Sequence, residues 1–231
     1  MSKKYDIKLY QYEVCPFCCK VKAYLDYKKL NYEIIEVNPL NKKEIAFSSY
    51  KKVPILIFNG EQINDSSNII DKLEELTVAI SNHNEEEKKW RDWLDNDFVH
   101  VLAPNIYSTI NEALQSFDYI TKVGKFSPLQ KHFIKISGAT AMYFVSKKLR
   151  QKHNIEEPRK ILYEKINYWL DNLKKTFMGG ENPNIADLTL FGYLKSIENF
   201  RAFYDLRLNT SIDKWFLPMK EFVTSSSVKK N

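Results

Sequence analysis

The sequence predicts an α/β domain followed by an all-α domain, and three observations support this division. Strand and helix patterns alternate over residues 1–77. Strand patterns then stop, and long amphipathic helical patterns with few glycines fill residues 85–231. Residues 78–84 fit neither pattern, and we interpret them as the linker between the two domains.

Each element of the first part has its own signal. Ile7 and Leu9 alternate with other residues as in a strand, and Pro16 suits the first turn of a helix. The pair Asn59-Gly60 predicts a hairpin turn. We therefore expect strands at 5–12, 31–37, 53–58 and 61–64, and helices at 17–29, 41–50 and 65–77. The order β-α-β-α-β-β-α is that of a thioredoxin-like domain, with a parallel, right-handed crossover between the first two strands.

The second part is predicted to be entirely helical. Asn184 and Asp187 stand three residues apart, as the N-cap and N3 residues of a capping-box variant, before a buried helix. Helical patterns cover residues 85–105, 128–153, 158–175, 182–197, 199–208 and 212–223. A thioredoxin-like domain followed by an all-helical domain is the architecture of the glutathione transferase superfamily.

Composition argues against several classes of protein. The net charge of +6 is spread over residues that mostly alternate in sign, which indicates solvated helix faces rather than nucleic-acid binding. No apolar run reaches the roughly 18 residues that a membrane span needs, and no secretory signal follows the first lysines. The three cysteines are an odd, clustered set, which favours a reducing compartment, and we expect a cytoplasmic protein.

The cysteines lie together after the first strand, at Cys15, Cys18 and Cys19. Cys15 falls at the start of a helix, where unpaired amide groups and the helix dipole stabilise a thiolate. We therefore predict that Cys15 is a nucleophile. Cys18 lies within reach of Cys15, either as a resolving thiol or as a group that tunes the acidity of the Cys15 thiol. Cys19 lies about 100° further round the helix, and we expect it to be a small buried hydrophobe.

Zinc binding and chance are the alternatives for this cluster. A zinc site needs four ligands, and the histidines lie in or just before the second part at unrelated spacings, so we expect no metal. A chance pair of cysteines without a redox role is disfavoured by the intervening proline and by the position after a strand.

Two further segments complete a predicted ligand site. Pro54 opens a strand, and in thioredoxin-like folds the peptide bond before this proline is usually cis and lets the preceding backbone, here that of Val53, pair with a peptide ligand. Asp65 and Ser66 start a helix, where a carboxylate and helix donors suit the ammonium and carboxylate of a γ-glutamyl group. The alternatives are an ordinary edge-strand proline and plain helix capping.

Long stretches of the chain resemble the prostaglandin E synthase 2 family of the glutathione transferase superfamily. They include YQYEVCPFCCKVKAYLDY, NDSSNII and FMGGENPNIADLTLFG, and the likeness extends over nearly the whole chain. It implies an often dimeric enzyme that binds glutathione and, in some preparations, haem ligated through the glutathione thiol. The residues that match the family's catalytic group are Cys15, Cys18 and Tyr12, and those that match its glutathione contacts and their neighbours are Phe17, Val53, Pro54, Asp65 and Ser66.

The sequence departs from this family pattern in two places. The animal enzymes carry an amino-terminal hydrophobic anchor that is absent here, so peripheral rather than tight membrane association is expected. Their long insertion after the first domain is reduced here to TVAISNHNEEEK, which removes part of the surface expected at a homodimer contact.

The resemblance implies the isomerisation of a lipid endoperoxide, prostaglandin H2, to prostaglandin E2. A thiolate attacks the peroxide, and an apolar slot holds the fatty-acid chain, for which the candidates are Tyr107, Phe117, Tyr143 and Phe144. Two other hypotheses remain open. The first is a glutaredoxin-like thiol–disulfide oxidoreductase or glutathione transferase. The second is a non-catalytic module that binds glutathione and haem.

Overall fold

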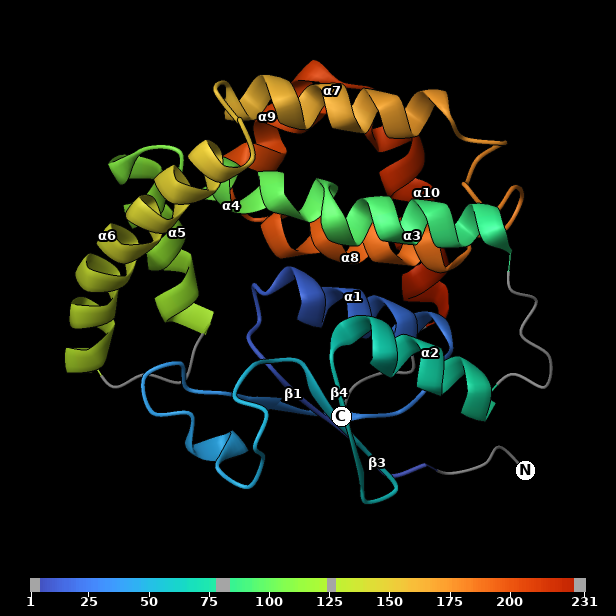
Figure 1. Ribbon diagram of the computed structural model, residues 1–231, viewed down its shortest axis with the longest axis horizontal. Helices are drawn as coiled ribbons and strands as arrows, with labels where there is room; N and C mark the ends of the chain where they lie inside the picture. Colours follow the sequence, from blue (N-terminus) through green and yellow to red (C-terminus); the bar gives the residue numbers. More distant parts are fainter. Residues whose placement is uncertain (1–4, 78–83, 124–127, 227–231) are drawn as a thin grey trace.

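The first part of the chain forms a four-stranded sheet with helices along one face (Figure 1). The computed structural model describes residues 5–77, 84–123 and 128–226. Strand β1 pairs in parallel with β2 and antiparallel with β3, which pairs antiparallel with β4, so the strand order is β2-β1-β3-β4. The elements are β1 Ile7–Gln11, α1 Pro16–Tyr27, β2 Glu33–Glu36, η1 Lys43–Ile45, β3 Ile55–Phe58, β4 Glu61–Asn64 and α2 Ser66–Thr77. This confirms the predicted thioredoxin-like domain.

The predicted hairpin is present, but the predicted helix at 41–50 is reduced to a single 3-10 turn. Asn59 and Gly60 have φ values of 49° and 89°, as a type I′ turn requires. At 41–50 the side chains of Asn41 and Ser48 accept hydrogen bonds from backbone N–H groups two residues on. These local bonds compete with a regular helix, so only Lys43–Ile45 is helical.

The second part of the described chain is helical, as predicted. Its elements are α3 Glu85–Asn96, η2 Phe98–Val101, α4 Leu102–Ile106, α5 Ile110–Val123, α6 Pro128–Lys152, α7 Pro158–Asp171, α8 Ile185–Ile197, α9 Arg201–Asn209 and α10 Asp213–Ser226. The segment at 85–105 is broken into α3, η2 and α4, and Pro104, which has no N–H to donate, lies in the first turn of α4. Helix α5 has no counterpart among the predicted elements.

The start of α8 has the predicted capping box. Asn184 Oδ1 accepts from the N–H of Asp187 at 3.1 Å, and Asp187 Oδ2 accepts from the N–H of Asn184 at 3.0 Å. Asp187 is fully buried and also accepts from Trp215 Nε1 at 2.9 Å, which ties α8 to α10. Of the predicted linker, residues 78–83 lie outside the described part, and Asn84 caps α3. The domain limits at 77 and 85 stay predictions.

Helix α1 lies between the sheet and the helical part (Figure 1). It packs directly on α8, and the contact is closest at Gly192, where a Cβ atom would lie 2.4 Å from Cα of Lys20. One apolar core continues from the sheet through α1 into the helical part. The helix that carries the cysteines is therefore held from both sides. None of the described helices is long and apolar enough to span a membrane.

Candidate active site

Cys15 is the N-cap residue of α1. Its backbone is extended, with φ −79° and ψ 123°, and Pro16 is the first helical residue. Its own N–H donates to the carbonyl oxygen of Tyr12 at 3.1 Å, which closes the turn from β1 into the helix. Cys15 is partly exposed, whereas Cys18 and Cys19 are buried. Cys15 is thus the least buried of the three cysteines, at the position expected for a nucleophile.

The three thiols differ sharply in acidity. The pKa of Cys15 is lowered, chiefly by a hydrogen bond from the Cys18 thiol; burial opposes this, while the amides of Cys18 and Phe17 support it. Burial and the neighbouring Cys15 raise the pKa of Cys18 well above its ordinary value. Burial raises the pKa of Cys19 to about 12, and its thiol donates to the carbonyl of Glu13 at 3.3 Å. Cys19 is therefore the buried packing residue that we expected.

The hydrogen bond from Cys18 gives a testable pH dependence. Because it stabilises the thiolate, Cys18→Ala should raise the pKa of Cys15 and move the pH profile of its alkylation by iodoacetamide to higher pH. In the wild type the midpoint should lie below that of a free cysteine. Cys18→Ser keeps a donor and should shift the midpoint less. An unchanged midpoint in Cys18→Ala would remove Cys18 from the tuning of this thiol.

Four tyrosines lie near enough to Cys15 for its charge to raise their pKa values. Burial raises the pKa of Tyr12, and the negative charge of Cys15 raises it further. The same two causes, in the same order, raise the pKa of the buried Tyr107. Burial is the main cause of the raised pKa values of Tyr50 and Tyr193, followed for Tyr193 by Asp95; the charges of Cys15 and Asp65 add to both. The sequence analysis proposed Tyr12 alone for the reaction and missed Tyr50 and Tyr193, which come from distant segments and have no local motif.

The predicted ligand contacts come from three segments of the first part: α1 carries Phe17, Val53 and Pro54 precede β3, and Asp65 and Ser66 lie at the start of α2. The Val53-Pro54 peptide bond is cis, as expected. Phe17 packs edge-on against Tyr193 of α8, with ring centroids 5.9 Å apart. Asp65 Oδ1 accepts from the N–H of Ser67 at 2.9 Å and of Asn68 at 3.3 Å, so the capping role weighed for Asp65 is confirmed. The pKa of Tyr50 is raised first by burial and then by the charges of Asp65, Cys15 and Cys18.

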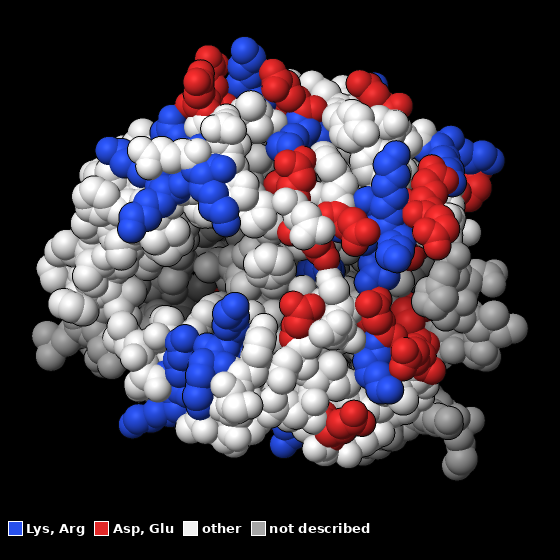
Figure 2. All heavy atoms as spheres, viewed as in Figure 1, with Lys and Arg blue, Asp and Glu red and all other residues white. Residues whose placement is uncertain are grey.

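Two of the four aromatic residues proposed for an apolar slot belong to the buried core, so their role in such a slot stays a prediction. Tyr107 and Phe117 are buried beside each other, with ring centroids 6.0 Å apart. Tyr143 is half-buried, and Phe144 is 57% exposed on α6. Figure 2 shows the surface hollowed between the α5–α6 pair and the η1 segment, on the side where α1 begins, with lysine and arginine side chains above and below the hollow.

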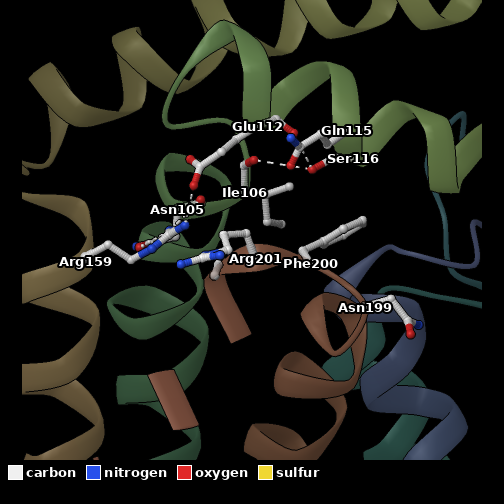
Figure 3. Close-up of a pocket in the computed structure, with 10 residues that line it drawn as sticks. Asn105, Ile106, Glu112, Gln115, Ser116, Arg159, Asn199, Phe200 and Arg201 are labelled. Atoms are coloured by element: carbon white, nitrogen blue, oxygen red, sulfur yellow. Dashed lines mark hydrogen bonds and ion pairs between the residues drawn. The ribbon is translucent and has the colours of Figure 1, made fainter. Parts of the chain in front are cut away.

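A second cavity lies elsewhere and is better explained as structural. It measures about 70 Å³ and lies among α4, α5, α7 and α9, with Arg159 reaching toward Asn105 and Glu112 (Figure 3). The Arg159 guanidinium donates to Asn105 Oδ1 at 2.9 Å, to Glu112 at 2.7 Å and to Asp205 at 3.1 Å. Because the guanidinium of Arg159 already donates to these protein groups, we assign this cavity no ligand.

Comparison with known proteins places this site in a family. The model of the glutathione S-transferase N-terminal domain matches residues 9–79. Prostaglandin E synthase 2 of Danio rerio is 39% identical over 93% of this chain and 70% of its own, and that of Mus musculus is 37% identical over 96% and 72%.

Solved structures share the fold at low identity. The apo form of glutathione S-transferase III superposes with a TM-score of 0.62 at 14% identity, covering 98% of this chain and 99% of that one. Glutaredoxin 2 of Salmonella typhimurium, solved in complex with glutathione, superposes with a TM-score of 0.57 at 15% identity, covering 95% and 97%. With Cys15 at the start of α1, this chain belongs to the prostaglandin E synthase 2 family of glutathione transferase-like enzymes.

Proposed function

We propose that this enzyme isomerises prostaglandin H2 to prostaglandin E2, with glutathione bound beside Cys15. The observation that carries the proposal is the lowered pKa of Cys15, the least buried of the three cysteines, at the start of α1 in a chain of this family. The hollow at the start of α1, bordered by cations, suits an anionic substrate such as a fatty acid. The buried Tyr107 and Phe117 suit its apolar chain.

Glutathione is proposed to lie between Cys15 and the start of α2. Asp65 Oδ1 already caps α2, and its second oxygen, Oδ2, is proposed to bind the γ-glutamyl ammonium. Ser66, the first residue of α2, is proposed to bind the γ-glutamyl carboxylate through its N–H or hydroxyl. The Val53 backbone, next to Pro54, and Phe17 complete the contacts. The glutathione thiol would then lie beside the sulfur of Cys15.

The reaction needs a thiolate and a group that first gives and then takes a proton. The thiolate of Cys15, or of glutathione beside it, attacks the peroxide oxygen on the carbon that becomes the ketone, so an S–O bond forms and the O–O bond breaks. The other oxygen leaves as an alkoxide and takes a proton, for which Tyr12 is the proposed donor because its raised pKa keeps it protonated. The Tyr12 phenolate that this step leaves then takes the adjacent C–H proton, which forms the carbonyl, breaks the S–O bond, returns the thiolate and restores the Tyr12 phenol.

Haem ligated through the glutathione thiol is a second proposal. Among the described residues, the groups that interact with Cys15 are thiols and phenols with cationic Lys22 nearby, which fits a thiolate-ligated iron. Bound haem would supply peroxide cleavage at the iron and shift the products toward fragmentation. Addition of haem with glutathione should then give a thiolate-type absorption spectrum.

A glutaredoxin-like activity is the second candidate, and the hydrogen bond between Cys18 and Cys15 favours it. In that reaction Cys15 attacks a glutathione mixed disulfide and Cys18 resolves the intermediate. Against it stands the raised pKa of buried Cys18, which makes it a poor attacking thiol. A homodimer and a peripheral membrane contact also stay predictions.

A paired assay on the purified wild type separates these functions. One arm follows prostaglandin H2 to prostaglandin E2 with glutathione present, and the other follows glutathione-dependent reduction of a mixed disulfide. We expect glutathione-dependent formation of prostaglandin E2 above the spontaneous rate. Disulfide reduction alone would replace the isomerase with the oxidoreductase, and inactivity in both arms with glutathione bound would favour a binding module.

A further inference from the structure

Helix α1 carries a lysine that is completely buried. Lys20 is 0% exposed. Its ammonium group lies 2.8 Å from Oδ1 and 2.6 Å from Oδ2 of Asp95 in α3, and it donates to the hydroxyl of Ser67 in α2 at 2.8 Å. An ammonium has three protons to donate, so these contacts satisfy it within the protein.

The carboxylate of Asp95 extends this contact into a network. It accepts from the Ser67 hydroxyl at 2.6 Å and from the phenol of Tyr193 in α8 at 2.5 Å. Ser67 thus accepts from Lys20 and donates to Asp95. Helices α1 and α2 of the first part are joined at this point to α3 and α8 of the second part.

The network lies between the two ends of the proposed glutathione site. Lys20 is on the same helix as Cys15, little more than one turn away. Ser67 directly follows Ser66, and its N–H donates to Asp65 at 2.9 Å. Any movement of Ser67 relative to Lys20 would therefore change the separation between the start of α2 and the thiol.

Stability alone does not explain a buried ion pair at this position. Apolar residues of similar size often pack as well or better in place of a buried ion pair, because removing two charges from water is costly. Directional hydrogen bonds, in contrast, fix the position of each helix that they join. We propose that Lys20, Ser67 and Asp95 are positioning residues that hold Asp65 and Ser66 at the distance from Cys15 that one glutathione molecule spans. This rests on the proposed glutathione site.

Lys22 provides a matched contrast two residues further on. It pairs with Glu13 at 3.0 Å, away from the network, and its charge is one of the causes that lower the pKa of Cys15. Lys22→Met should therefore move the pH midpoint of Cys15 alkylation to higher pH. Variants of the network should instead weaken glutathione binding and leave that midpoint in place, because Lys20 is not among the principal groups that shift it.

The test compares glutathione affinity and thiol acidity in the same proteins. Glutathione binding is measured by calorimetry, the Cys15 midpoint by iodoacetamide alkylation, and folding by thermal melting, for the wild type, Ser67→Ala, Ser67→Thr, Lys20→Met and Lys22→Met. We expect Ser67→Ala and Lys20→Met to weaken binding by about tenfold, the worth of one lost hydrogen bond to a charged group. Ser67→Thr should restore most of the affinity.

Two kinds of result would overturn the inference. Lys20→Met leaves the carboxylate of Asp95 without its cation and can fail to fold, so Ser67→Ala, which keeps the ion pair, carries the decision. A folded Ser67→Ala that binds glutathione as tightly as the wild type, or whose lost affinity Ser67→Thr does not restore, contradicts it. If the wild type itself binds no glutathione, the proposed site fails and the inference falls with it, and the wild-type titration identifies that case.

Discussion

Cys15→Ser should lower the glutathione-dependent conversion of prostaglandin H2 by roughly 10³-fold or more, the scale on which enzymes lose activity with their nucleophile. The structure lowers the pKa of a thiol at this position. A serine hydroxyl is far less acidic, so the same amides and the same Cys18 cannot keep it ionised at neutral pH. The measurement is the initial rate of prostaglandin E2 formation with saturating glutathione.

Cys19→Ala is the matched control on the same helix. Cys19 is 5% exposed, with a pKa raised to about 12, so its thiol is neither accessible nor ionised at neutral pH. Its loss should change the rate by less than about threefold. If Cys15→Ser binds glutathione and keeps the full rate, the attacking thiolate is that of glutathione alone, and Cys15 has no covalent role.

Gly192→Ala should destabilise the protein more than the same change at Gly138, the other helix glycine compared below. The added Cβ would lie 2.4 Å from Cα and 2.5 Å from the N atom of Lys20 and 2.7 Å from the carbonyl carbon of Cys19. These are backbone atoms of α1, so α1 and α8 must move apart. We expect a loss of about 2 kcal/mol in the free energy of unfolding, after the better helix propensity of alanine is included. The melting temperature should fall by about 5 °C for a chain of this length.

Gly138→Ala in α6 provides the control for this effect. A Cβ there would also meet an atom at 2.4 Å, but that atom belongs to the ring of Phe117, which can rotate or shift. The cost should therefore be within about 1 kcal/mol of zero. Equal losses at the two glycines would show that the close approach of α1 and α8 is not rigid.

Local patterns in the sequence were sufficient for much of the fold. The Asn59-Gly60 turn, Pro16 at the start of α1 and the Asn184–Asp187 capping box each act within a few residues, and all three are present. The prediction of a short helix at 41–50 was wrong, because hydrogen bonds that the side chains of Asn41 and Ser48 accept from the backbone compete with the helix. Such bonds depend on the conformation and leave no periodic signal.

The surroundings of the thiol were less accessible to sequence reasoning. Cys15 lies in a motif, whereas Tyr50, Tyr107 and Tyr193 reach it from segments that only the fold brings together. Tyr107 was listed for an apolar slot and not as a neighbour of the thiol. Lys20 has no local signal in the sequence, because helical periodicity does not reveal that Asp95 and Ser67 accept hydrogen bonds from it.

The most direct test of the account is the site of mixed-disulfide formation with oxidised glutathione. The Cys15 thiolate attacks one sulfur of the disulfide, a Cys15–glutathione disulfide forms, and one glutathione thiolate leaves. In Cys18→Ser, which keeps a hydrogen-bond donor to Cys15 but has no resolving thiol, peptide mass spectrometry should find glutathione on Cys15, none on Cys19, and faster modification at neutral pH than on a free cysteine peptide. Glutathione found on other residues and not on Cys15, or modification no faster than that of the peptide, would contradict the claim that Cys15 is a thiolate next to a glutathione site.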